Sequence, residues 1–145
     1  DYLIEKSKDI KTLNELHENT FKRQGIQRSD HDKLLCNEIA RKAIDNNLGD
    51  LIICRNKNNE PVAGGLFLND KKSCYYVVGA TEEKERKNSP MTFIILEQIK
   101  KLFSEQIEYL DFCGINSPNR GDYKTSFNGT IINYFLPVIE KAKDE

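Results

Sequence analysis

A single lysine near the C-terminal end of the chain has the setting that most clearly suggests chemistry. The segment 109–129 reads as a buried strand, a polar loop of Gly, Asn and Pro, and one short helical turn that presents Lys124. Open α/β sheets bind ligands beyond the carboxyl ends of their strands, and a lysine ammonium is a point charge that suits phosphate. We therefore expect Lys124 to contact an anion, with the rings of Tyr123 and Phe127 fixing its direction. A solvated surface lysine is the alternative.

Two further charged residues belong to the same segment. Arg120 could add a second positive charge to the same pocket, or it could be a solvated loop arginine. Asp111 lies at the strand end beside the loop and is the best-placed carboxylate for a general base. Its alternative role is a hydrogen bond to the backbone of 114–116. The sequence suggests no Ser/His/Asp or Cys/His set, so we expect no covalent enzyme intermediate.

Composition points to one soluble domain. The chain has 145 residues, of which 38% are hydrophobic and 31% charged, and a formal net charge of -1. This charge gives no overall bias toward nucleic acid or anionic membranes. No apolar run approaches the ~20 residues that span a bilayer, and no signal peptide is evident, so we expect a cytoplasmic location. The chain begins at Asp1 without Met, which we interpret as a piece excised from a larger protein.

The four cysteines suggest structure more than chemistry. They are Cys36, Cys54, Cys74 and Cys113, and none forms a C-x-x-C pair. We expect reduced, buried thiols. The two histidines are isolated from every cysteine, so the sequence predicts no metal site.

Hydrophobic periodicity and turn residues predict the elements that must position Lys124. Helices are expected at 9–21, 29–45 and 90–103, with Ser89 as the N-cap of the third and Pro90 as its first residue. Strands are expected at 51–55, 62–68, 73–80, 107–113 and 130–135, and a short helical turn at 123–127. The first three strands are joined by short polar turns, which predicts an antiparallel meander. A helix then leads to a parallel strand, so the fold class is α/β with a mixed sheet.

Several segments in this order resemble the FemAB-like acyltransferase domains of the GNAT superfamily. They are 17–25 (HENTFKRQG), 61–67 (PVAGGLF), 75–81 (YYVVGAT), 110–119 (LDFCGINSPN) and 123–129 (YKTSFNG). The sequence departs from the family pattern in having Tyr123 where Phe is usual and Asn128 before Gly129. The resemblance implies a single GNAT-like domain over 1–140, followed by a charged tail over 141–145.

The resemblance also implies a function. An acyl or aminoacyl group would pass from an activated donor, acyl-CoA or aminoacyl-tRNA, to the amine of a small molecule or peptide, as in bacterial cell-wall peptide modification. Lys124 would contact the anionic part of the donor, which could be the acceptor end of a tRNA. FemAB-related enzymes commonly pair two GNAT-like halves, so a second half or a homodimer is implied as a partner.

The resemblance assigns roles to two other segments. In GNAT folds the strand carrying Val77, Val78 and Gly79 splays, and its amides hold the acyl carbonyl; Gly79 followed by Ala80 would allow a bulge. A strand end that needs small residues is the alternative. The loop between the first two helices borders the acceptor site, so Arg23 and Gln24 could contact the acceptor, or simply match charge at a helix end.

One segment argues against acetyl-CoA as the donor. GNAT enzymes that use coenzyme A carry a glycine-rich loop before the third helix, and its amides cradle the diphosphate. Here 82–89 reads EEKERKNS, without a glycine, which predicts a solvated charged loop. The helix start at Ser89 would remain available for an anion. A plain acetyl-CoA-dependent N-acetyltransferase and a non-catalytic GNAT-like half that serves in binding or docking are the other readings.

Overall fold

The computed structural model describes residues 2–114 and 121–133. The chain divides into two units, Asp1–Cys113 and Gly114–Glu145, and each is described by itself. The first unit contains the sheet and the three long helices. The second contains the segment that carries Lys124.

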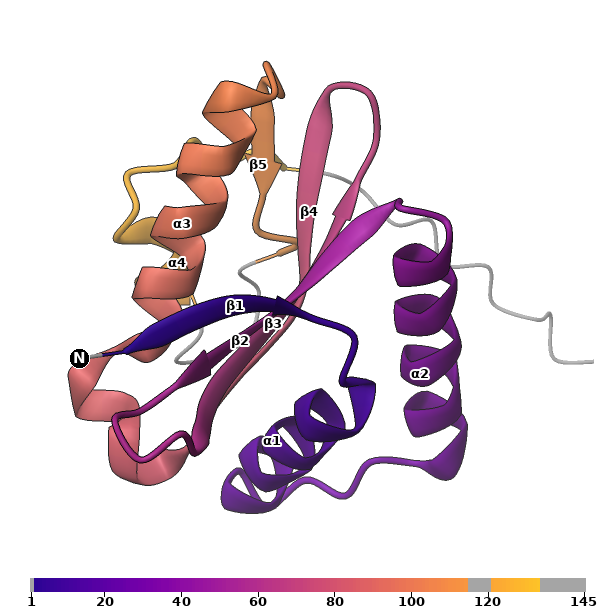
Figure 1. Ribbon diagram of the computed structural model, residues 1–145, viewed down its shortest axis with the longest axis vertical. Helices are drawn as coiled ribbons and strands as arrows, with labels where there is room; N and C mark the ends of the chain where they lie inside the picture. Colours follow the sequence, from indigo (N-terminus) through magenta and orange to yellow (C-terminus); the bar gives the residue numbers. More distant parts are fainter. Residues whose placement is uncertain (1, 115–120, 134–145) are drawn as a thin grey trace, which may run out of the picture. The chain divides into compact units, whose positions relative to one another are not determined.

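The first unit is built on one five-stranded sheet. Its strands are β1 (Leu3–Ser7), β2 (Gly49–Arg55), β3 (Pro61–Asn69), β4 (Ser73–Thr81) and β5 (Tyr109–Asp111), in the spatial order β1-β2-β3-β4-β5. The first four strands are antiparallel to their neighbours, whereas β5 runs parallel to β4. Figure 1 shows this sheet with helices on both faces. The predicted mixed sheet, a meander followed by a helix and a parallel strand, is therefore confirmed.

Helices α1 (Ile10–Arg23) and α2 (Asp30–Asp45) cover one face, and α3 (Pro90–Ser104) covers the other (Figure 1). Two adjacent glycines of β3 show this directly. A Cβ on Gly64 would lie 3.1 Å from a methyl of Leu13 in α1, whereas a Cβ on Gly65 would lie 3.4 Å from Ile94 in α3. Because neighbouring residues of a strand point to opposite faces, small residues here let both layers approach the sheet closely.

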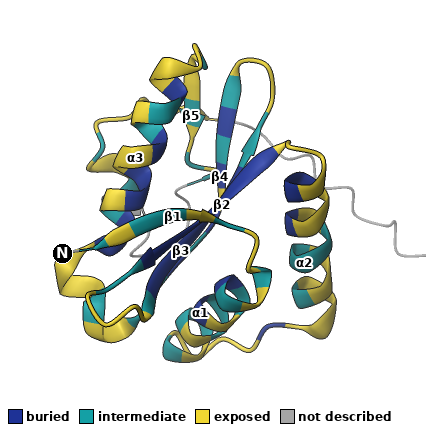
Figure 2. Cartoon of the chain, viewed as in Figure 1, coloured by how far each residue is buried: buried dark blue, intermediate teal, exposed yellow. Residues whose placement is uncertain are grey.

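The core lies between these layers, and the buried residues of the long helices lie on the sides that face the sheet (Figure 2). The cluster on the α1 and α2 side contains Leu13, Ala40, Ile44, Leu51, Ile53, Leu66 and Val78. Burying one such large aliphatic side chain contributes roughly 1.5–3 kcal/mol. Not every apolar residue of α2 joins the core: Leu34 and Leu35 keep 61% and 50% of their surface exposed.

Strand β1 was not predicted. It pairs with β2 from Leu3↔Arg55 to Ser7↔Leu51 and forms one edge of the sheet. Its sequence, LIEKS, has only two large apolar residues and two charges, so it carries too little alternation to be recognised. Strand β5 is shorter than the predicted 107–113.

A buried carboxylate connects this edge strand to α3. Asp50 of β2 is only 2% exposed, and its side chain lies 2.5 Å from the ammonium of Lys6 in β1. It also pairs with the ammonium of Lys101 in α3. Burial raises the pKa of Asp50, but the hydrogen bonds from Lys101 and Lys6 outweigh it, and the net shift is downward. The carboxylate therefore stays ionised and holds three elements together.

In the second unit, α4 (Gly121–Thr125) confirms the short helical turn that carries Lys124. The predicted strand 130–135 is wrong for its described part. Residues 130–133 have no regular structure, and Ile131 and Ile132 are 61% and 81% exposed. Residues 134 and 135 lie outside the described residues.

The described residues also bear on the expectations for membrane spans, metal sites and cysteines. None of their helices is long and apolar enough to cross a membrane. They hold no cluster of three or more His, Cys, Asp or Glu side chains that could bind a metal. All four cysteines are free thiols, but only Cys54 and Cys74 are buried; Cys113, expected inside a strand, is exposed just beyond β5.

Candidate functional site

Strands β4 and β5 pair over a short distance only. Their register is Ser73↔Tyr109, Cys74↔Leu110 and Tyr75↔Asp111, after which β5 ends. Strand β4 continues to Thr81, paired with β3 on its other edge. Within residues 2–114, the β5-facing edge of β4 therefore has no strand partner beyond Tyr75. Backbone N–H and C=O groups on such an edge must find partners in water, loops or a ligand.

A β-bulge lies just beyond this point. Across β3 and β4, Leu66 pairs with Val78 but Phe67 pairs with Tyr76, so Val77 has no opposite residue. The extra residue places Tyr76 and Val78 on opposite faces: Tyr76 stacks on Phe67 toward α3, and Val78 joins the cluster on the α1 side. The bulge was predicted, but at Gly79 and Ala80, two residues further on. Val77 itself is 40% exposed at the surface.

The side chain of Tyr76 leaves no room for a Cβ atom at position 79. A Cβ on Gly79 would lie 1.6 Å from the Tyr76 hydroxyl oxygen and 2.4 Å from the ring carbon that carries it. The ring cannot move aside easily, because it stacks on Phe67 at 5.3 Å and meets Phe112 edge-on at 6.0 Å. The structure thus favours the alternative reading of this glycine, as a position where only a small residue fits. Tyr76 was not among the candidate residues, since a buried Tyr in a strand gives no distinct signal.

The segment between β4 and α3 has no buried residue, as expected of a solvated charged segment, but it is regular structure where a loop was expected. Residues Glu83–Asn88 form a 3-10 helix, η1. Its last turn is closed by the N–H of Ser89, which donates to the carbonyl of Arg86 at 3.1 Å. The preceding Glu82 is held on both sides: its N–H donates to Val62 O at 2.9 Å, and its carboxylate accepts from Asn19 of α1 at 3.0 Å.

Helix α3 begins at Pro90, as predicted, but Ser89 does not cap it with its side chain. Ser89 has the left-handed conformation, with φ 51° and ψ 49°, and its hydroxyl makes no capping bond. A capping serine normally has extended backbone angles, and here the closure of η1 excludes them. The start of α3 thus follows a tight left-handed turn.

Arg23 lies at the end of β4. Its guanidinium donates to the carbonyl of Thr81 at 3.2 Å, which brings the C-terminus of α1 to the strand that carries Val77 and Gly79. Gln24 is the C-cap residue, and its N–H donates to Phe21 O at 2.9 Å. The predicted acceptor residues and the predicted β4 residues thus belong to neighbouring parts of the first unit.

Asp111 makes a local contact. Its carboxylate accepts a hydrogen bond of 2.7 Å from the N–H of Cys113, which has φ 54°. This turn is of the kind expected when an Asp carboxylate stabilises the backbone two residues further on. The contact favours the loop role of Asp111 over the role of general base.

Lys124 is held within the second unit. Its ammonium donates to the carbonyl oxygen of Gly114 at 2.8 Å. Tyr123 of the same short helix meets Phe127, which lies just beyond the helix, edge-to-face, with ring centroids 5.4 Å apart. The two rings therefore pack together, as expected of residues that anchor this turn. Arg120 lies outside the described residues.

Comparison with known proteins identifies the family. A protein-family model described as an acetyltransferase (GNAT) domain matches residues 2–125. The chain thus belongs to the GNAT acetyltransferase domain family, and its mixed sheet is the GNAT fold. A search of curated protein sequences finds no significant match.

Solved structures agree with this fold. A predicted acetyltransferase from Clostridium acetobutylicum, solved with acetyl-CoA, is 19% identical with a TM-score of 0.75, covering 96% of both chains. An aminoglycoside acetyltransferase from an uncultured soil metagenomic sample, solved with sisomicin, is 14% identical with a TM-score of 0.72, covering 98% of this chain and 97% of its own. A ribosomal-protein-alanine N-acetyltransferase from Brucella melitensis is 11% identical with a TM-score of 0.65, covering 98% and 100%. At these identities the likeness is one of fold.

Proposed function

We propose that this chain is an acyl-CoA-dependent N-acyltransferase domain, with acetyl-CoA as the first donor to test. The observation that carries the proposal is the early end of the pairing between β4 and β5. Within residues 2–114, the ladder between β4 and β5 ends at Tyr75, and the bulge at Val77 lies in the part of β4 that continues beyond it. An extended ligand with amide groups can take the place of the missing strand by bonding to such an edge.

The donor's phosphates would lie at η1 and the start of α3. A helix N-terminus attracts anions through its unpaired N–H groups and its dipole, so the turn at Ser89 would face the diphosphate. Arg86 and Lys87 of η1 are exposed and form no ion pair in the described part of the chain. Their positive charges would attract the diphosphate. In enzymes with a glycine-rich loop, backbone amides have that role.

The transfer itself needs little covalent chemistry from the protein. The amine nitrogen of the acceptor attacks the thioester carbonyl carbon, and the C–S bond then breaks. The amine proton leaves to water, and the coenzyme A thiolate takes up a proton. Backbone N–H groups of Val77, Val78 and Gly79 would bond the carbonyl oxygen as it gains negative charge. Because Asp111 is engaged with Cys113, we assign proton removal to water in preference to Asp111.

The remaining candidates bind the two substrates. Lys124, with Tyr123 and Arg120 in the same segment, would contact the anionic part of the donor. Arg23 and Gln24, at the loop after α1, would border the acceptor. The relatives acting on an aminoglycoside and on the alanine of a ribosomal protein suggest a small-molecule or peptide amine as the acceptor.

Binding and turnover test this proposal separately. Isothermal titration calorimetry of the chain with acetyl-CoA and with free coenzyme A should give saturable binding at one site. Thiol release should then be followed with a thiol-reactive dye, using a panel of aminoglycosides and peptide amines. Absence of binding by either coenzyme A ligand would remove the proposal; binding without turnover would support a docking half that has lost catalysis.

One observation favours a second candidate, transfer of an aminoacyl group from tRNA. Residues 82–89 contain no glycine, and Glu83–Asn88 within them form a 3-10 helix, unlike a diphosphate-cradling loop. The FemAB-like segments around Lys124 agree with such a donor, and a second GNAT-like half or a homodimer would then complete the enzyme. Binding of a tRNA acceptor-stem hairpin by a protein that binds no acyl-CoA would select this candidate. Light scattering of the purified protein would report the homodimer.

A further inference from the structure

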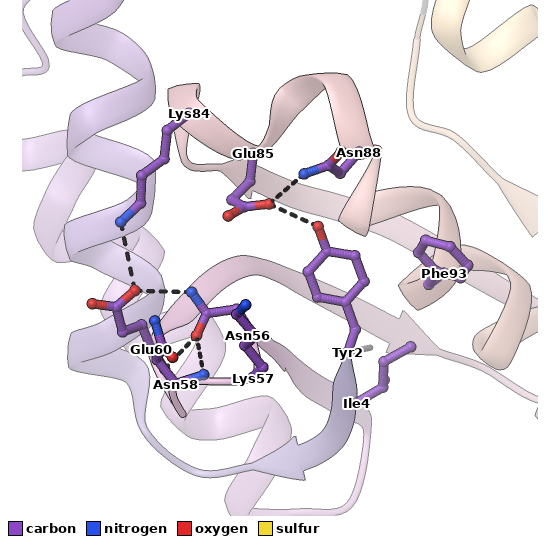
Figure 3. A pocket seen from close by; sticks show the side chains of 10 residues that line it. All are labelled: Tyr2, Ile4, Asn56, Lys57, Asn58, Glu60, Lys84, Glu85, Asn88 and Phe93. Carbon is purple, nitrogen blue, oxygen red and sulfur yellow. Dashed lines mark hydrogen bonds and ion pairs between the residues drawn. The ribbon is translucent and has the colours of Figure 1, made fainter.

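A hollow of about 820 Å³ lies beside β1, which forms the edge of the sheet opposite β5. Its described lining comes from the start of β1, the turn between β2 and β3, η1 and the first turn of α3 (Figure 3). No residue to which the proposed function assigns a role belongs to this described lining. Small-molecule sites usually measure roughly 300–1,000 Å³, so the hollow is large enough for a ligand of its own.

Glu85 of η1 is anchored in this hollow through one of its two carboxylate oxygens. Its Oε2 atom accepts from the Tyr2 hydroxyl at 2.7 Å and from the Asn88 amide at 2.8 Å (Figure 3). The hydrogen bonds from Asn88 and Tyr2 lower the pKa of Glu85, so the group is an anion at neutral pH. Within the described part of the chain its Oε1 atom accepts no hydrogen bond, and it can accept one from a ligand.

Glu60, in the turn between β2 and β3, is anchored in the same way. Its Oε2 atom accepts from the Asn56 amide at 2.8 Å and lies 3.6 Å from the Lys84 ammonium (Figure 3). The hydrogen bond from Asn56 and the charge of Lys84 lower the pKa of Glu60. Asn56 is itself fixed, because its side-chain oxygen accepts the N–H groups of Asn58 and Glu60 at 3.0 Å. The hollow therefore holds two ionised carboxylates whose positions are set before a ligand arrives.

Two aromatic rings form another part of the lining. The rings of Tyr2 and Phe93 lie with centroids 5.7 Å apart and planes inclined by 48°. Phe93 keeps 44% of its surface exposed, so part of its ring is open to a ligand. The face of an aromatic ring carries partial negative charge and attracts the slightly positive C–H groups of a ligand. A sugar ring has such C–H groups on its face and hydroxyls around its rim.

The charges in the described lining balance. The two glutamates are matched by two lysines, Lys57 and Lys84, and the other polar side chains are Tyr2 and three asparagines. A site with equal positive and negative charge has little attraction for a ligand of high net charge. Its amides and carboxylates instead supply many donors and acceptors, which suits an uncharged ligand with many hydroxyls.

We propose that this hollow is a carbohydrate-binding site, which takes an uncharged sugar. The sugar ring would pack on Phe93 and Tyr2, and its hydroxyls would donate to the open oxygens of Glu60 and Glu85. Its hydroxyl oxygens would accept from the asparagine amides and the lysines. The inference goes beyond the proposed acyl transfer and does not depend on the identity of the donor.

Nuclear magnetic resonance titration tests this site, because Asn56, Asn58 and Asn88 each give side-chain amide signals. Glucose and N-acetylglucosamine should shift these signals with a Kd on the order of 1 mM, as expected of an open site. The backbone signals of 77–79 should not shift. The Kd should be the same at about 50 mM and about 500 mM salt, because salt screening acts on charged ligands.

Two charged sugars distinguish the proposal from an ion site. Glucosamine carries an ammonium and glucuronate a carboxylate on the same ring. Salt-sensitive binding of only one of them would show an amine site or an anion site and would overturn the proposal. So would the absence of any shift with all four sugars.

Variants locate the bound sugar. Phe93→Leu keeps an apolar side chain but removes the ring, and its Kd should rise about fivefold. Glu85→Gln keeps an oxygen for Tyr2 and Asn88 but presents an amide to the hollow. Its Kd should also rise about fivefold, because hydrogen bonds to an ionised acceptor are the stronger ones.

Matched controls lie outside the hollow. Phe103→Leu changes another phenylalanine of α3, which is 87% exposed, and Glu38→Gln changes a carboxylate of α2 that pairs with Arg41. Both should bind the sugars like the wild type. Equal affinity in Phe93→Leu, Glu85→Gln and the wild type would overturn the proposal. Acetyl-CoA binding by the wild type is measured separately, so failure of either proposal leaves the other in place.

Discussion

The ammonium of Lys124 and the carbonyl oxygen of Gly114 are joined by a hydrogen bond of 2.8 Å. The two residues are ten positions apart in the sequence. A lysine with this contact has a local role besides any ligand. The position of its charge is set by the chain before a donor arrives, which is the condition for binding a phosphate without a large ordering cost.

Replacement of Lys124 separates these two roles. Lys124→Ala should weaken acetyl-CoA binding by roughly 10- to 100-fold, because a charge-assisted hydrogen bond to phosphate contributes roughly 1.5–3 kcal/mol. The loss of the Gly114 contact should lower the free energy of unfolding by no more than about 1 kcal/mol. Calorimetry and urea unfolding measure the two effects. Lys100→Ala, which removes an exposed lysine paired with Glu97, is the control. Donor affinity unchanged in Lys124→Ala would remove Lys124 from the site.

Gly79→Ala should destabilise the protein by about 1–3 kcal/mol, because the new methyl collides with the Tyr76 ring. Urea unfolding gives the value. The destabilisation caused by Gly79→Ala should be smaller when Tyr76→Leu is already present, since the colliding ring is then absent. A double-mutant cycle measures this coupling. Gly129→Ala, which meets nothing within 4 Å, should change stability by less than about 0.5 kcal/mol. An equal cost in both backgrounds would point to a backbone requirement at Gly79.

The fold was predictable where local patterns are strong. Ser29 caps α2, accepting the N–H of Asp32 at 3.0 Å, and Pro90 opens α3, as their residue types indicate. What failed depends on contacts between distant residues. Ser89 has the right type and position for a cap, yet the 3-10 helix before it imposes a left-handed backbone. Sequence periodicity carries no information about such a constraint.

The sequence indicated which strand carries the candidate site, but not the contacts between distant residues that shape it. The bulge was expected from Gly79, but its place at Val77 follows from the pairing of Tyr76 with Phe67 across two strands. Elsewhere, the hydroxyl of Tyr2 donates to the carboxylate of Glu85, 83 residues away, at 2.7 Å. No spacing rule connects positions so far apart, and a lone Tyr at the start of a short edge strand gives no local signal.

Asp50→Asn should lower the free energy of unfolding by about 2 kcal/mol at neutral pH, the usual size for hydrogen bonds to a charged group. The folded pKa of Asp50 is below its model-compound value of 3.8, so the carboxylate stabilises the fold above that value. Its contribution disappears as pH falls through the lower folded pKa. The hydrogen bond and charge of Asp50 raise the pKa of Lys101. The contribution of Lys101 to stability is therefore fully present below its ordinary pKa of 10.5 and is lost as pH rises through the raised pKa.

The measurement is urea unfolding at several pH values. The difference between wild type and Asp50→Asn should be constant from about pH 5 to pH 9 and should shrink below about pH 4. Glu97→Gln, which removes an exposed ion pair with Lys100, should cost less than about 0.5 kcal/mol. A difference that persists at low pH would show that Asp50 acts through packing and not through charge.

The four thiols should react with iodoacetamide at different rates. Burial raises the pKa of Cys54 and of Cys74 to about 11, so at pH 8 both are protonated as well as inaccessible. Cys113 is exposed and should be alkylated first, and the half-buried Cys36 should follow more slowly. Peptide mass spectrometry identifies the modified positions. Labelling in urea, where all four should react, is the control; fast native labelling of Cys54 or Cys74 would contradict the buried positions of β2 and β4.

The two edges of β4 differ in a way that amide hydrogen exchange would detect. Toward β3, N–H groups are paired along the strand to Thr81, whereas toward β5 the ladder stops at Tyr75. Deuterium should therefore enter at alternate positions beyond the bulge while their neighbours remain protected for much longer. A molecule that settles along the open edge would slow uptake at those positions alone. The strand thus contains its own internal reference for reading where a bound molecule lies.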